Sequence, residues 1–161
     1  MSWMDQLVVT IAPGEGAGYN EPTLGLYASA VVNGRELPDV IDIDVFFEAL
    51  TGSGPLPLFT CTCGVFGCGG YYVGVARDDS AWIWRNHYAP DDEPNLGHVT
   101  EVVELRFAWP EVRAVATDLL ATLRALQRDK PGVQLMAAST GIDLRDRLDH
   151  YQEQVQAIPE A

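Results

Sequence analysis

The chain has 161 residues, 47% of them hydrophobic, and a formal net charge of −13 from 23 acidic and 10 basic side chains. Nucleic acids and anionic membranes bind proteins largely through lysine and arginine, so this charge argues against both as partners. The same charge favours solubility and would attract a basic partner protein. The length predicts a single domain, residues 1–161, with enough apolar residues to bury a core.

The compartment is predicted from features near the N-terminus and from the cysteines. Residues 1–5 lack the basic start and apolar stretch of a signal peptide. No run in the chain approaches the roughly 18 apolar residues of a membrane span. An odd number of cysteines and the lack of an Asn-x-Ser/Thr sequon fit a reducing compartment. We therefore expect a cytoplasmic protein.

The first strands are predicted from alternation of apolar residues. A strand is expected over 7–12 and another over 24–32. The second ends at the Asn-Gly pair at 33–34, which is typical of a hairpin because both residues tolerate positive φ. A return strand is expected to pass through Leu37 or Val40.

Three segments carry apolar residues at helical spacing. A short helix is predicted near 43–51, behind Asp42 or Asp44 as its N-cap. A long helix is predicted from Pro110 to Arg128. A last helix is expected after a capping box, with one buried stripe. The box is formed by Thr140 and Asp143, and the stripe by Leu148, Tyr151, Val155 and Ile158.

The middle of the chain predicts a meander. Segments 56–63, 71–77 and 81–88 are joined by short turns, which force antiparallel neighbours. The clearest alternation runs over 100–109 and predicts a further strand. Together these elements predict an α+β fold: a mostly antiparallel sheet with a central meander, covered on one face by the two C-terminal helices.

The segment with the most reactive side chains is a predicted glycine-rich hairpin that contains all three cysteines, Cys61, Cys63 and Cys68. Three thiolates at this spacing could supply three of the four ligands of a tetrahedral zinc ion. The spacing is less specific for zinc than paired Cys-x2-Cys knuckles. The fourth ligand would be one of the three histidines, His87, His98 or His150.

The strand register favours a structural role for the cysteines. If loop 64–67 has four residues and turn 78–80 has three, Gly74 and Ala76 lie opposite Trp84 and Trp82. One face of the sheet then contains Phe59, Cys61, Cys63, Cys68, Tyr72, Trp82, Trp84 and Tyr88, while His87 lies on the other.

Such a face is typical of a core, so the cysteines are interpreted first as small buried packing residues. A metal site and a redox or disulfide pair of Cys63 with Cys68 remain alternatives. The metal site requires a β-bulge, or a ligand from outside the meander such as His98 or His150.

The segment Phe59-x-Cys61-x-Cys63-Gly64-x3-Cys68-x-Gly70 resembles one found in small uncharacterised bacterial proteins, some of which look like immunity-type partners of toxins. The resemblance implies a bacterial cytoplasmic protein that binds another protein, and it implies no catalytic residue. The chain also has no Gly-x-Ser-x-Gly elbow, His-Glu-x2-His helix or Walker loop. We expect a non-enzymatic binding module without a cofactor. The alternative is a zinc-binding or thiol-redox protein that uses the three cysteines.

Overall fold

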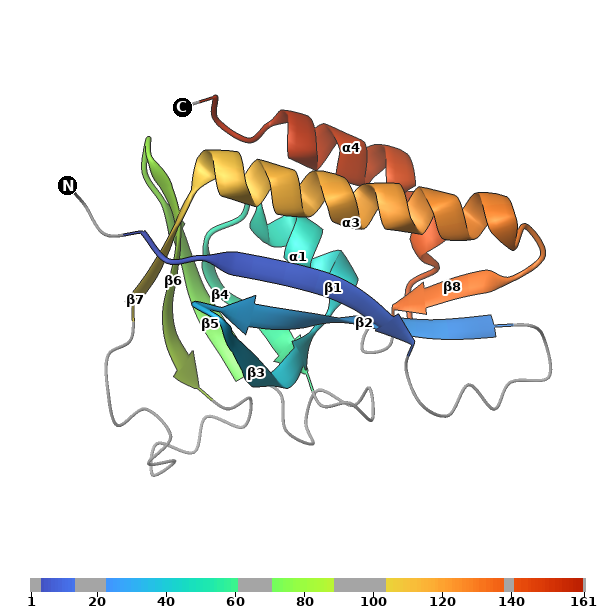
Figure 1. The fold of residues 1–161 in the computed structure, drawn as a ribbon, viewed down its shortest axis with the longest axis horizontal. Helices are drawn as coiled ribbons and strands as arrows, with labels where there is room; N and C mark the ends of the chain where they lie inside the picture. Colours follow the sequence, from blue (N-terminus) through green and yellow to red (C-terminus); the bar gives the residue numbers. More distant parts are fainter. Residues whose placement is uncertain (1–3, 14–22, 61–70, 89–103, 138–140, 161) are drawn as a thin grey trace.

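The fold is that of a computed structural model, which describes residues 4–13, 23–60, 71–88, 104–137 and 141–160. Within these residues an eight-stranded sheet has the order β1 to β7, with β8 beside β2 (Figure 1). The strands are β1 (Leu7–Pro13), β2 (Thr23–Val32), β3 (Arg35–Ile41), β4 (Gly54–Thr60), β5 (Tyr71–Arg77), β6 (Ala81–Tyr88), β7 (Glu104–Ala108) and β8 (Gln134–Ala137). The helices are α1 (Ile43–Ala49), α3 (Trp109–Asp129), the short 3-10 helix η1 (Leu144–Arg147) and α4 (Leu148–Gln156).

The sheet curls until its first and last strands meet. Just before β1, Asp5 forms a parallel bridge with Phe107 of β7. The Asp5 N–H donates to the Arg106 carbonyl at 2.7 Å. The strand pairs along the path from β1 to β7 are antiparallel, and β8 pairs with β2 in parallel. The predicted mixed fold with a mostly antiparallel sheet is therefore confirmed.

Helix α1 lies at the centre of the core. Asp42 caps it by accepting a hydrogen bond from the Val45 N–H at 3.0 Å, which confirms the first of the two predicted N-caps. Phe46 packs edge-on against Trp82 of β6, and the Trp82 indole N–H donates to the Ala49 carbonyl at 2.9 Å. The helix is thus held at its start, along its face and at its end.

Helix α3 runs beside β1, and α4 lies against α3 on the side away from the sheet (Figure 1). The buried face of α3 is formed by Trp109, Val112, Ala116, Leu119, Leu120 and Leu123. Because the sheet is nearly closed, the expected covering of one sheet face by the two C-terminal helices stays a prediction. None of the helices in the described ranges is long and apolar enough to cross a membrane.

Most predicted elements are confirmed, but some of them begin or end at other residues than predicted. The strand predicted over 100–109 ends at Ala108, because Trp109 begins α3. Asp143 caps η1 instead of completing a box for one continuous helix, and Thr140 lies outside the described residues. The apolar piece after α3 forms β8, which the sequence did not place in the sheet.

The predicted register of the meander is wrong by one residue. The turn between β5 and β6 has four residues instead of three, since Arg77 pairs with Trp82, and Trp84 pairs with Val75 instead of Gly74. Phe59 pairs with Tyr71 instead of Tyr72. The burial of Phe59, Trp82 and Trp84 is nevertheless confirmed.

Candidate functional site

The residues predicted to form a metal or thiol site are divided by the structure. Cys61, Cys63, Cys68 and His98 lie outside the described residues. The backbone of His87 pairs with Val73, beyond a register shift in β6, and its side chain is not among those that the structure describes. His150 is the one candidate ligand whose side chain can be placed, and it lies in α4.

His150 is already engaged by a carboxylate. Its Nε2 atom lies 2.6 Å from Oε1 of Glu48 in α1, and Gln154 lies one turn further along α4, with its Nε2 3.4 Å from the same ring nitrogen. Both His150 and Glu48 are about one-third exposed. The pair therefore joins α4 to α1 at the protein surface.

Arg147 connects this pair to the interior. Its Nη2 donates to the Glu48 carboxylate at 2.5 Å, and its Nε donates to Oδ1 of Asp44 at 3.1 Å. Asp44 is buried and also accepts a hydrogen bond from the Tyr151 hydroxyl at 2.5 Å. We call Asp44, Glu48, Arg147, His150 and Tyr151 the α1–α4 cluster.

The electrostatics of the α1–α4 cluster favour a fixed protonation state for its interior members. Burial raises the pKa of Tyr151 far above its usual value, and the hydrogen bond to Asp44 adds to the shift. Burial alone would lower the pKa of Arg147, but the Asp44 carboxylate reverses this and raises it. Tyr151 thus stays a neutral donor and Arg147 stays a cation.

Helical spacing explains how the α1–α4 cluster assembles. Asp44 and Glu48 lie four residues apart and share one face of α1. Arg147 and Tyr151 have the same spacing at the start of α4, where Tyr151 also stacks on Phe47 with ring centroids 4.3 Å apart. An acidic pair on one helix thereby meets a donor pair on the other.

The contacts of the α1–α4 cluster indicate a structural role. Its carboxylates accept from Arg147, Tyr151 or His150. Among the described residues, no group of three or more His, Cys, Asp or Glu side chains is arranged to hold a metal ion. We interpret the α1–α4 cluster as the polar attachment of α4 to the core.

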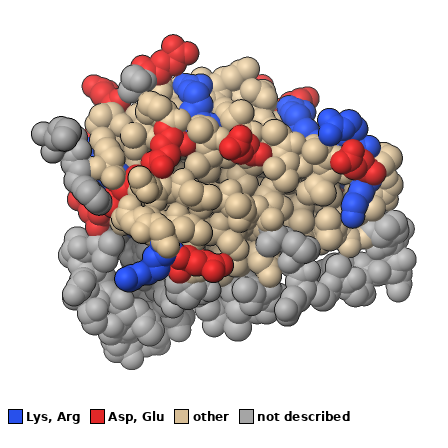
Figure 2. Space-filling view, viewed as in Figure 1, with Lys and Arg blue, Asp and Glu red and all other residues tan. Residues whose placement is uncertain are grey.

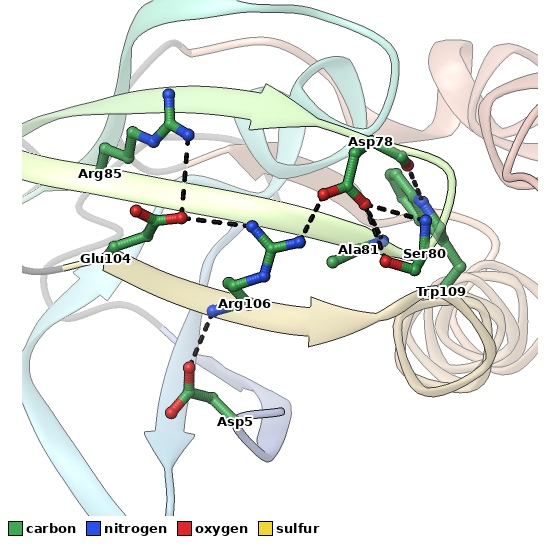
Figure 3. Close-up of polar contacts among 8 residues, drawn as sticks. All are labelled: Asp5, Asp78, Ser80, Ala81, Arg85, Glu104, Arg106 and Trp109. Carbon is green, nitrogen blue, oxygen red and sulfur yellow. Dashed lines mark hydrogen bonds and ion pairs between the residues drawn. The ribbon is translucent and has the colours of Figure 1, made fainter. Parts of the chain in front are cut away.

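A second polar group lies on the outside of β5–β7 (Figure 3). Arg106 donates to Asp78 in the β5–β6 turn and, at 3.3 Å, to Glu104, which is also paired with Arg85 at 3.7 Å. The hydrogen bond from Arg106 is the main reason that the pKa of Asp78 is lowered. Arg106 stands opposite the buried Ile83, so its aliphatic stem can cover that strand.

Comparison of the chain with protein-family models, curated proteins and solved structures finds no significant match. Sequence patterns predict Asp44 only as a cap and Tyr151 only as an apolar contact, so they do not predict the α1–α4 cluster. The signal was the complementary spacing of acids on one helix and donors on another.

Proposed function

We propose that the protein is an acidic, non-enzymatic binding module whose partner is a protein with a basic surface. The support is the net charge of −13 together with the way the few cations are used. A strongly acidic protein attracts basic partners over long range and raises their association rate.

The main support for this proposal is the set of contacts that the basic side chains make within the chain. All ten lysines and arginines lie in the described residues, and eight of them are within ion-pair or hydrogen-bond distance of an acceptor in the same chain. These eight are Arg77, Arg85, Arg106, Arg113, Arg124, Arg128, Arg145 and Arg147. With 23 acidic against 10 basic side chains, and most of the basic ones in contact with acceptors of the same chain, the uncompensated charge of the protein is acidic.

The acidic groups are distributed instead of gathered at one point. On the face shown in Figure 2, acidic and basic side chains surround a broad uncharged area. Along the outer side of η1 and α4, Asp146, Asp149 and Glu153 are all exposed. Such a distribution supports general attraction of a basic protein more than recognition of a single small cation.

The resemblance of the cysteine hairpin to immunity-type proteins further specifies the class of partner. Immunity-type proteins are partners of toxins, so the resemblance favours a toxin as the partner, and the net charge of −13 favours a basic one. The α1–α4 cluster is consistent with a binding role, because its charged groups are directed at one another instead of at a substrate.

The test uses tagged full-length protein as bait in a bacterial extract at about 0.05 M and 0.5 M salt, between which the Debye length falls roughly threefold. We expect a basic protein to be retained at low salt and released at high salt. The retained protein is then purified and its Kd measured by calorimetry.

A matched pair of variants controls for non-specific attraction. D146N/E153Q removes two exposed charges from η1 and α4, while D118N/D129N removes two exposed charges from α3. Unequal effects on Kd indicate a defined interface. Retention of no protein, or a Kd that does not change with salt, would contradict the proposal.

The alternative function is a metal or thiol activity centred on Cys61, Cys63 and Cys68, with zinc held by these thiolates and by His98 or His150. The support is the cysteine spacing. Metal analysis of protein purified without chelator is the test, with C61S/C63S/C68S as control. Less than about 0.1 zinc or iron per chain, with thiols unreactive until unfolding, would eliminate it.

A further inference from the structure

One buried carboxylate joins three distant parts of the chain at the closure of the sheet. Asp5, only 7% exposed, accepts from the Arg106 N–H of β7 at 2.8 Å through Oδ2 (Figure 3). Through Oδ1 it accepts from the Asn33 side-chain amide at 2.9 Å, in the turn between β2 and β3. We call Asp5, Asn33 and Arg106 the closure clasp.

Asn33 makes further contacts to the start of β1. Its Oδ1 accepts from the Gln6 N–H at 2.8 Å, and its own N–H donates to the Gln6 carbonyl at 3.0 Å. Asn33 and Gly34 have φ values of 53° and 79°, which is the conformation of a tight hairpin turn. The Asn33 amide is thus both a hairpin residue and a donor to the closure clasp.

Asn33 is also the only asparagine of the chain that is followed by glycine. It is exposed, and a Cβ placed on Gly34 would meet nothing within 4 Å. An Asn-Gly bond is chemically labile, because glycine leaves the following backbone nitrogen open to attack the side-chain amide.

We propose that Asn33 is a site of spontaneous deamidation and that its conversion opens the closure clasp. The backbone nitrogen of Gly34 loses its proton and attacks Cγ of Asn33. The Cγ–Nδ2 bond breaks, ammonia leaves and a succinimide forms. Water then opens the ring at Cγ to give aspartate, or at the α-carbonyl to give isoaspartate, so the net reaction consumes one water and releases one ammonia.

The product cannot make the contact that the amide makes. Nδ2 of Asn33 donates to Asp5, whereas an ionised aspartate at position 33 has only acceptors and carries the same charge as Asp5. Two carboxylates about 3 Å apart, one of them buried, disfavour each other's ionised form. Isoaspartate also lengthens the backbone within a turn whose register holds β2 against β3.

The closure clasp also controls how fast the reaction occurs. The two hydrogen bonds of the Asn33 amide hold Cγ and Nδ2 in place, so attack by the Gly34 nitrogen requires the turn to open. The rate in the folded protein therefore reports the stability of the clasp.

The first experiment follows deamidation of the full-length protein in mildly alkaline buffer by peptide mass spectrometry. We expect conversion at Asn33 and much slower conversion at Asn20, Asn86 and Asn95. D5A should accelerate conversion at Asn33 about tenfold, the factor that corresponds to about 1.4 kcal/mol. D118A is the control, because it removes an exposed carboxylate of α3 that is not part of the closure clasp.

Two outcomes of this experiment overturn the proposal. One is an unmodified Asn33 in the folded protein under conditions in which the urea-unfolded chain converts. The other is an unchanged rate in folded D5A. If D5A does not fold, the ratio of the wild-type rates in urea and in native buffer replaces it, and a ratio near one rules out protection by the clasp.

The second experiment tests the consequence by thermal unfolding. N33D should lower Tm more than N33S, because both remove the donor but only aspartate adds a charge beside Asp5. The double variant D5N/N33D exchanges donor and acceptor and should recover most of the loss. Equal Tm values for N33D and N33S, or no recovery in the double variant, would show that the carboxylates do not oppose each other.

Discussion

Tyr151 combines a buried ring, an aromatic stack and a hydrogen bond to a carboxylate. Its ring is fully buried and stacks on Phe47, while its hydroxyl donates to the buried Asp44. A carboxylate in the interior depends on such donors, because an unpaired buried charge is strongly destabilising. The hydroxyl is therefore expected to contribute more than its size suggests.

We predict that Y151F lowers the free energy of unfolding by about 1.5–3 kcal/mol, the range for hydrogen bonds to charged groups. The ring and its stacking on Phe47 are retained, so the loss reports the hydroxyl. Urea unfolding is the measurement, and a double-mutant cycle with D44N tests the coupling. A loss below about 0.5 kcal/mol, or additive effects in the cycle, would show that the contact is weak.

The second residue-scale prediction concerns Asp143, which caps η1. The hydrogen bonds from Arg145 lower the pKa of Asp143 below its usual value. A carboxyl with a lowered folded pKa adds stability above its unfolded pKa, and this stability is lost as pH falls through the folded pKa. The contribution should thus disappear below about pH 4.

Removing Arg145 tests this assignment. We expect R145A to be less stable than wild type at pH 7 and to lose less stability on acidification, so that the two curves converge at low pH. Urea unfolding as a function of pH is the measurement, with R128A as an exposed arginine control. Parallel curves for wild type and R145A would contradict the prediction.

At the scale of elements, the position of α1 depends on its N-cap residue, Asp42. The helix has only seven residues, too few to be stable alone, and it is flanked by strands β3 and β4. The Asp42 side chain satisfies the Val45 N–H, and the Asp42 N–H donates to the Leu58 carbonyl at 3.0 Å. Asp42 thus caps α1 with its side chain and contacts β4 with its backbone.

We predict that D42A destabilises the protein by about 1–2 kcal/mol through loss of the cap. D42N and D42S should recover much of the loss, because each keeps an oxygen that can accept from Val45. Tm and urea unfolding measure the series. If asparagine and serine are as destabilising as alanine, the cap is not the reason for the effect.

At the scale of the whole molecule, the charge of −13 opposes compaction. Salt screens repulsion between exposed carboxylates, whereas the partly buried pair of Asp44 and Arg147 is screened less. The net effect of moderate salt should therefore be stabilising, which is the reverse of what surface ion pairs alone would give.

We expect Tm to rise by a few degrees between low and about 0.3 M sodium chloride, where a change of 1 kcal/mol corresponds to about 2–4 °C. The variant D118N/E153Q, which removes two exposed charges, should start at a higher Tm and respond less to salt. Potassium chloride should act like sodium chloride if screening is the cause. A Tm that falls with salt would show that ion pairs outweigh the repulsion.

The sequence by itself determined the elements whose signals are local. Alternating apolar residues predicted β1, β2 and β7, and Asn33-Gly34 predicted the hairpin, since φ/ψ preferences act on single residues. The apolar stripe after Pro110 predicted α3 to within one residue at each end. Burial of Trp82 and Trp84 also followed from the sequence, because large aromatic residues contribute most to a core.

Only the tertiary structure decided how these elements meet. The four-residue turn before Trp82 and the register shift before His87 change which residues face each other, and composition does not specify either. Asp44 and Tyr151 are 107 positions apart, and β8 joins β2 across a similar separation. Such contacts depend on the curvature of the whole sheet, so the α1–α4 cluster and the closure at Asp5 appear only when the chain is folded.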